Sequence, residues 1–75
     1  MAKVEKTLER MRNNPAGWKI EDLEVVAERS GVRVRKGKGS HVVFVADDGQ
    51  RLTVPARRPI KPVYVRAFVA LVEGV

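Results

Sequence analysis

Apolar residues recur at the spacing of an α-helix in three segments of the chain. In residues 3–13 they form a narrow stripe among charged side chains, and a run of turn-forming residues follows. Residues 20–30 repeat the pattern with a fuller apolar face, and Gly31 stands where a left-handed helix cap is expected. These spacings predict two amphipathic helices joined by a turn.

The third helical segment, residues 62–73, is apolar on nearly every side. Pro62 suits the first turn of a helix, and Gly74 suits its end. Two apolar stripes run along this helix, one made of Tyr64, Phe68 and Leu71 and the other of Val65, Val69 and Val72. A helix with two apolar faces is usually packed on both. We expect one stripe to lie on a sheet and the other to be covered by the first helix or by a partner protein.

Between the second and third helices the apolar period changes from about 3.6 to 2, the period of a half-buried strand. Val32 and Val34 alternate with arginines, and further strands are predicted at residues 41–46 and 51–55. Residues 47–49, Asp-Asp-Gly, suit a three-residue hairpin loop with glycine in the left-handed position. The prediction is a three-stranded antiparallel sheet.

The hairpin loop also predicts which side chains share a face of the sheet. With Ala46 opposite Gln50, Phe44 pairs with Leu52 on the apolar face. The opposite face then displays Arg33, Arg35, His41, Val43, Val45, Arg51 and Thr53. A slip of one residue would bury the arginines, which argues against it. In this arrangement we expect one of these arginines, Arg35, opposite His41.

The order of elements is therefore α-α-β-β-β-α, an α+β fold with the helices packed on one face of a three-stranded antiparallel sheet. The 75 residues are expected to form a single domain, 1–75, in which residues 1–17 add a helix and a turn to a core of residues 18–75. The chain has no cysteine, so a packed apolar core has to stabilise it without disulfide bonds.

The net charge of the chain indicates which kind of partner it could bind. The chain has 15 Lys and Arg against 9 Asp and Glu, a net charge of +6. This excess favours a polyanion such as nucleic acid, although it also serves solubility alone. No stretch approaches the roughly 20 apolar residues of a membrane span, and the charged start is unlike a signal peptide, so we expect a cytoplasmic protein with no membrane contact. One histidine without cysteine supplies no dedicated metal site, and no cofactor is expected.

His41, the only histidine, begins a strand directly after a basic, glycine-containing turn. Histidine is the side chain that most readily gives or takes a proton near neutral pH. With cations to stabilise the charged transition state, such a group can cleave RNA by activating the 2′-hydroxyl, without a metal ion. The alternative is that a lone surface histidine has no chemical role.

Seven basic residues are candidates for binding RNA phosphates: Arg33, Arg35, Lys36, Lys38, Arg51, Arg57 and Arg58. Most of them are expected on the face of His41, whereas two aspartates lie at the far hairpin tip. The alternative is that they are solvated charges that protect an exposed sheet from aggregation. Gly39 and Ser40 are interpreted as the turn that supports the site; a phosphate cradle formed by Gly37 and Gly39 is the other interpretation.

Five sequence features occur in the order found in the HicA toxin family. They are Lys38-Gly39-Ser40-His41, the Val-Val-Phe that follows, an Asp-Gly hairpin, a strand ending in Thr-Val-Pro, and Ile-Lys-Pro before a closing helix. Residues 20–71 thereby resemble that family. The resemblance implies a fold similar to the double-stranded-RNA-binding domain and an mRNA-cleaving activity in which His41 is the catalytic histidine. It also implies a HicB-type antitoxin that binds and silences the toxin.

Two features depart from the family pattern. Many members begin close to the second helix, whereas this chain adds an amphipathic segment around residues 3–12. A second histidine often follows the first, and here that position is Val42, which is predicted to face the core. The leaving group would then take its proton from a lysine, an arginine-bound water or bulk water. A slow enzyme is expected.

Together these observations predict the toxin component of a type II toxin–antitoxin system, a metal-independent endoribonuclease that cleaves mRNA. A non-catalytic RNA- or DNA-binding module of the same fold is the alternative, because the basic composition supports both equally. A third hypothesis, compatible with the first, is an interaction protein whose basic face is covered by an acidic antitoxin. The motif around His41 is what separates the first hypothesis from the second.

Overall fold

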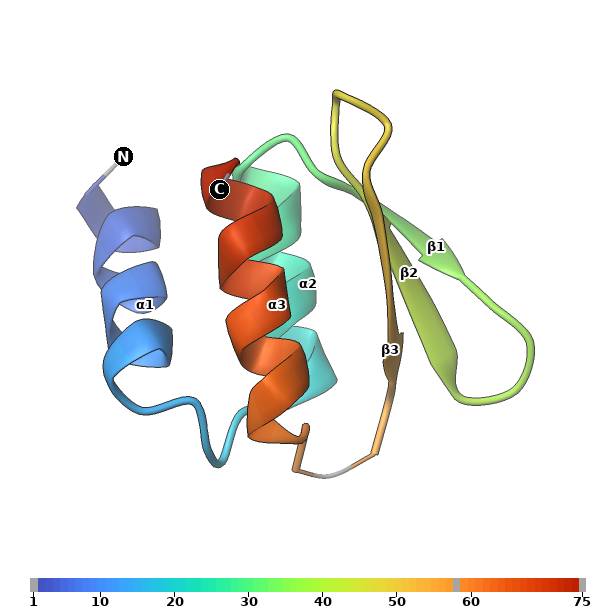
Figure 1. Ribbon diagram of the computed structural model, residues 1–75, viewed down its shortest axis with the longest axis horizontal. Helices are drawn as coiled ribbons and strands as arrows, with labels where there is room; N and C mark the ends of the chain where they lie inside the picture. The colour runs from blue at the N-terminus through green and yellow to red at the C-terminus, as the bar shows by residue number, and fades with distance from the viewer. Residues whose placement is uncertain (1, 58, 75) are drawn as a thin grey trace.

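Three helices and three strands follow one another in the order expected from the sequence (Figure 1). The computed structural model describes residues 2–57 and 59–74. Its elements are α1 (Ala2–Asn13), α2 (Ile20–Arg29), β1 (Arg33–Lys36), β2 (His41–Val45), β3 (Arg51–Pro55) and α3 (Pro62–Glu73). The predicted α+β layout, α-α-β-β-β-α, is thus confirmed.

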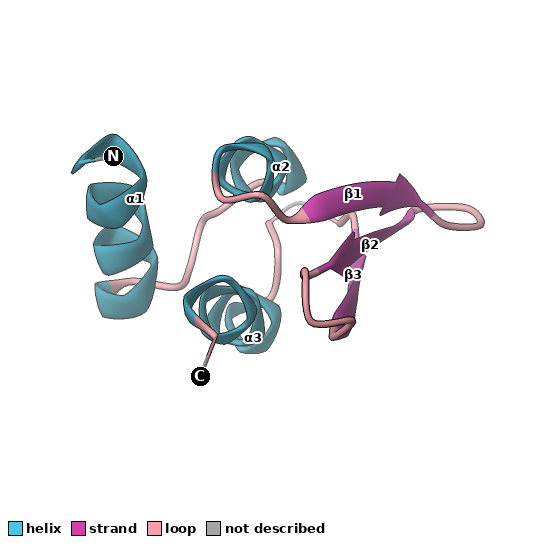
Figure 2. Ribbon diagram, turned by 90° about the horizontal axis from the view of Figure 1, so that it is seen from above, coloured by secondary structure: helices cyan, strands magenta, loops and turns pink. Residues whose placement is uncertain are grey.

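The helices form two layers on one side of the sheet. α2 and α3 lie side by side against the sheet, and α1 packs on them from the side away from it (Figure 2). From α1, the buried residues Leu8 and Met11 join the apolar core that includes residues of α2 and α3. The first helix therefore covers α3 on the side away from the sheet, which was one of the two possibilities for its second apolar stripe.

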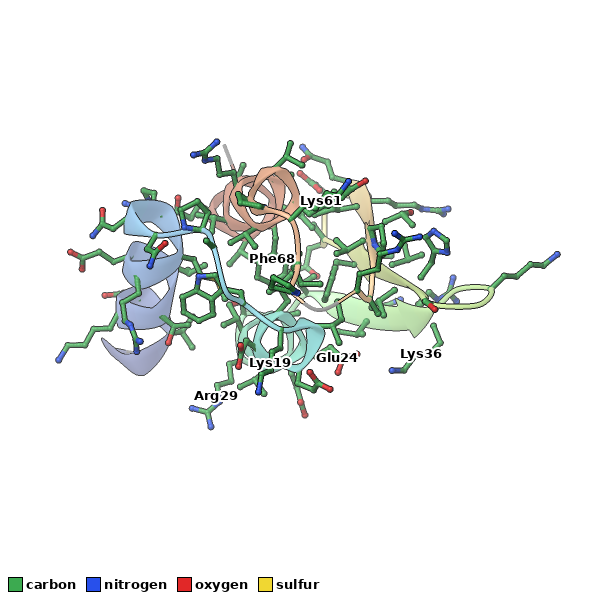
Figure 3. All side chains as sticks on the ribbon, turned by 90° about the horizontal axis from the view of Figure 1, so that it is seen from below. Lys19, Glu24, Arg29, Lys36, Lys61 and Phe68 are labelled. Atoms are coloured by element: carbon green, nitrogen blue, oxygen red, sulfur yellow. The ribbon has the colours of Figure 1, made fainter. Side chains whose placement is uncertain are left out.

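Two phenylalanines join the sheet to the helices. Phe44 of β2 and Phe68 of α3 are fully buried, and their ring centroids lie 4.9 Å apart at an interplanar angle of 62°. This edge-to-face arrangement is a favourable one for aromatic pairs. Phe68 lies near the centre of the molecule, between α3 and the sheet (Figure 3). The pair therefore joins α3 to β2 within the apolar core.

The register of the second hairpin is the predicted one, with Phe44 opposite Leu52 and Val42 opposite Val54. The register of the first hairpin differs from the prediction. Arg35 pairs with Val43, not with His41. The partner of His41 is Gly37, two residues beyond Arg35 along the chain, because a turn of three residues closes the hairpin. The shift of two residues leaves every side chain on its predicted face.

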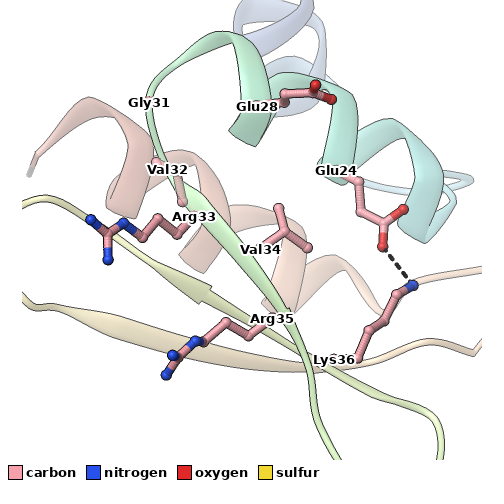
Figure 4. A pocket seen from close by; sticks show the side chains of 8 residues that line it. All are labelled: Glu24, Glu28, Gly31, Val32, Arg33, Val34, Arg35 and Lys36. Carbon is pink, nitrogen blue, oxygen red and sulfur yellow. Dashed lines mark hydrogen bonds and ion pairs between the residues drawn. The ribbon is translucent and has the colours of Figure 1, made fainter.

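β1 forms one edge of the sheet, which has the order β1-β2-β3. Val34, predicted to face the core, does point toward α2, but it stays 36% exposed because no strand lies beyond it. Lys36 lies on the same, helix-facing side of the sheet, opposite Val42. Its ammonium nitrogen donates a hydrogen bond of 3.2 Å to the carboxylate of Glu24 in α2 (Figure 4).

Candidate functional site

A three-residue turn positions His41 at the start of β2. The backbone N–H of Gly37 donates to the carbonyl oxygen of His41 at 2.8 Å, which closes the turn over residues 38–40. Gly39 adopts a left-handed conformation with φ +65°, which glycine adopts without steric cost. From the other side, the N–H of Ala56 donates to the carbonyl oxygen of Ser40 at 2.6 Å. Gly39 and Ser40 thus lie in a turn directly before His41, and their predicted role in supporting a site stays a prediction.

The same turn orients the exposed imidazole ring. Nδ1 of His41 lies 3.2 Å from the carbonyl oxygen of Lys38. A carbonyl oxygen only accepts hydrogen bonds, so in the neutral ring the proton sits on Nδ1 and that nitrogen donates. Nε2 then carries the lone pair, and it is the nitrogen that can take a proton from a substrate.

A pocket of about 560 Å³ adjoins His41. It lies between the turn before β2, the end of β3 and the first turn of α3. Lys38, Arg57 and Lys61 line it together with Tyr64. In the described part of the chain, no acidic residue is among those that line it. The pocket therefore collects three cations beside the His41 imidazole, a composition suited to an anion.

Lys61 and Tyr64 were not among the residues selected from the sequence. Tyr64 was assigned to an apolar stripe, but the structure leaves it half-buried at the pocket wall. Lys61 immediately precedes α3 and lies beside the sheet (Figure 3). The sequence shows a basic loop ending at Lys61, but its closeness to His41 depends on how α3 packs against β3.

The seven predicted phosphate-binding residues do not all lie in one place in the structure. Lys38 and Arg57 share the pocket with His41. The exposed residues Arg33, Arg35 and Arg51 lie on the same face of the sheet as His41, farther along it: Arg35 is opposite Val43, and Arg33 and Arg51 flank Val45 from both sides. Lys36 is on the helix-facing side, bonded to Glu24. Arg58 lies outside the described residues.

A strand rises about 3.3 Å per residue and successive residues on one face are two apart. The outer face of the sheet is therefore a short track that runs from the row of Arg33 and Arg51, past Arg35, to the row of His41 and Pro55. Each row is about 7 Å from the next. Such a track can hold an extended polyanion with its reacting atom at the His41 end.

Two absences apply to the described residues. No group of three or more His, Cys, Asp or Glu residues within 2–57 and 59–74 could hold a metal ion. Over the same ranges, no helix has the length and apolar character needed to cross a membrane.

The closeness of Gly37 to His41 yields a prediction. A Cβ on residue 37 would lie 3.3 Å from both the Cβ and the carbonyl oxygen of His41. We expect Gly37→Ala to push His41 aside, to shift the NMR signals of its ring and to cost about 1 kcal/mol of stability.

Gly17→Ala is the matched control for this variant. Gly17 has φ +81° and no atom within 4 Å of an added Cβ. Its replacement should cost about 1 kcal/mol through backbone strain alone and leave the His41 signals unchanged. Identical His41 signals in wild type and Gly37→Ala would contradict the turn described above.

Comparisons with known proteins identify no relative. Protein-family models, curated proteins and solved structures all lack a match to this chain. The resemblance of residues 20–71 to the HicA family accordingly stays a prediction. The function has to be inferred from the chemistry around His41.

Proposed function

We propose that the chain is a metal-independent endoribonuclease that cleaves mRNA, acting as the toxin of a type II toxin–antitoxin system of the HicA–HicB kind. One observation carries the proposal. The exposed His41 lies beside a pocket lined by Lys38, Arg57 and Lys61, and the described residues give the pocket no carboxylate and give Nε2 of His41 no hydrogen-bond partner. A proton acceptor next to clustered cations is what cleavage of RNA by its own 2′-hydroxyl requires.

In the proposed reaction, Nε2 of His41 takes the proton of a ribose 2′-hydroxyl. The O2′–P bond forms, the P–O5′ bond breaks, and the products are a 2′,3′-cyclic phosphate and a free 5′-hydroxyl. Lys38, Arg57 and Lys61 stabilise the extra negative charge on the phosphoryl oxygens. The leaving O5′ takes its proton from a lysine ammonium or from water, since no second histidine exists in the sequence.

The outer face of the sheet gives this enzyme a path for its substrate. Arg33, Arg35 and Arg51 are exposed along the track that ends at His41. Arginine binds phosphate through two parallel hydrogen bonds, so these residues suit the phosphates that flank the cut. An acidic, HicB-type antitoxin that covers the same face would keep RNA from His41. A toxin that cleaves mRNA would act in the cytoplasm.

A non-catalytic RNA- or DNA-binding module is the second candidate. The arginine track favours it, because three cations on an exposed sheet face bind a polyanion without any chemistry at His41. The binding constant of such a module falls as salt is added, and the slope of its logarithm against the logarithm of the salt concentration is about −0.7 per phosphate contacted on a single strand. The module leaves the strand intact.

The deciding experiment compares two substrates in the presence of EDTA. One is a 5′-labelled mRNA fragment, and the other is the same fragment with 2′-deoxyribose at the mapped cut. We expect the first to yield a cyclic phosphate and the second to resist cleavage by at least about 100-fold with unchanged binding, because it lacks the nucleophile. Equal cleavage of both, or loss of cleavage in EDTA, would refute this mechanism. Salt-sensitive binding with no cleavage of either would establish the module.

A further inference from the structure

The outer edge of β1 has free backbone hydrogen-bonding groups. Paired residues of antiparallel strands alternate between those that exchange hydrogen bonds and those that do not. Gly37 bonds His41, so Arg35 and Arg33, two and four residues back, bond β2 as well. The N–H and C=O of Val34 and Lys36 therefore point away from β2. No backbone group elsewhere in the described chain bonds them.

A groove runs beside this edge, between β1 and α2 (Figure 4). Val32 and the part-exposed Val34 form its apolar floor, and Glu28 of α2 stands on its far wall. Glu28 forms no ion pair within the described residues. The side chains of Arg33 and Arg35 point out of the groove, to the other face of the sheet. The edge thus offers an apolar and acidic side and a basic side.

We propose that β1 binds an extended segment of a partner protein as a fourth strand, a segment that alternates acidic with apolar residues. Side chains of an added strand alternate between the two faces. Acidic residues would then lie beside Arg33 and Arg35, and an apolar residue would cover Val34. A lysine two residues beyond the apolar one would reach Glu28. This inference does not require RNA cleavage. It shares Arg33 and Arg35 with the proposed RNA track, whereas the groove residues Val34, Glu24 and Glu28 lie outside that track.

Charge excludes a second copy of this chain as the favoured occupant. Two β1 strands side by side would bring the arginines of one copy against those of the other, and like charges across strands are destabilising. RNA is also disfavoured in the groove. Lys36 faces it and pairs with Glu24, which leaves the carboxylate of Glu28 without a cation among the described residues. A segment with acidic residues on one side and apolar residues and lysine on the other matches both walls.

The test uses the full chain and a synthetic, end-capped peptide, Thr-Glu-Val-Glu-Lys-Thr, titrated into isotope-labelled protein and followed by NMR. Binding should shift the amide signals of residues 32–36. Val34→Pro should weaken it at least tenfold, because proline removes an edge N–H that β2 does not use and is tolerated on edge strands. A peptide of the same composition with the two glutamates adjacent should bind at least tenfold more weakly.

A charge exchange keeps the test decisive if Val34→Pro fails to fold. The double variant Arg33→Glu/Arg35→Glu alters only exposed side chains. It should no longer bind the glutamate peptide, and it should bind a peptide that has lysines in place of the two glutamates. Unchanged binding to this variant would overturn the proposal. So would peptide shifts confined to residues 38–41 and 57, or a wild-type dimer in sedimentation that Val34→Pro abolishes.

Discussion

His41→Ala is expected to lower the rate of RNA cleavage by about 10²- to 10⁴-fold, the contribution of a positioned acid–base group. The imidazole is exposed, and its Nδ1 is held by the carbonyl oxygen of Lys38, so its replacement removes the proton acceptor without opening the core. RNA binding should stay within about threefold of wild type, because the phosphate-binding cations remain. The measurement is single-turnover cleavage of a labelled mRNA fragment, with affinity measured separately on the 2′-deoxy analogue.

Arg35→Ala is the matched control on the same face of the sheet. It lies in the track but outside the pocket, so it should weaken RNA binding and reduce its salt dependence, with little change in the rate at saturating protein. Cleavage that survives His41→Ala at the wild-type rate would show that another group does the chemistry. If weaker RNA binding by His41→Ala accounted for its whole loss of cleavage, His41 would be a binding residue.

Phe44→Ala is expected to destabilise the fold by about 3–5 kcal/mol. The ring is fully buried and packs edge-to-face on Phe68 at 4.9 Å between centroids, where the strands on both sides of β2 hinder collapse of the cavity. Small domains are stable by only about 5–15 kcal/mol, and 75 residues bury a modest core. The variant should therefore be largely unfolded near body temperature. Urea denaturation followed by circular dichroism measures the loss.

Val63→Ala serves as the control for this core variant. Val63 lies in the first turn of α3 and is 62% exposed, so its replacement should change the free energy of unfolding by less than about 0.5 kcal/mol. A cost below about 1 kcal/mol for Phe44→Ala would mean that sheet and helices are not joined through this pair.

Local pattern alone predicted the elements and the two faces of the sheet. An apolar period of about 3.6 indicates a helix, and a period of 2 indicates a strand. The length of the Asp-Asp-Gly loop at residues 47–49 determines the register in which β2 pairs with β3. Because successive strand residues alternate in direction, the sequence also determined that His41, Arg33 and Arg35 share the outer face. The predicted register of the first hairpin was wrong by two residues, but the faces were still correct, because a shift of two residues changes the cross-strand partner of a side chain and not the face on which it lies.

Only the tertiary structure decided which residues surround His41. The turn conformation at Gly39 set the pairing of β1 with β2, and it separated Arg35 from His41 by two residues. The packing of α3 brought Lys61 and Tyr64, which follow His41 by 20 and 23 residues, to the same pocket. Such contacts depend on how buried surfaces fit together across the whole domain, and no local spacing encodes them. The sequence therefore determined the histidine and its face, and the packing of α3 against the sheet decided its neighbours.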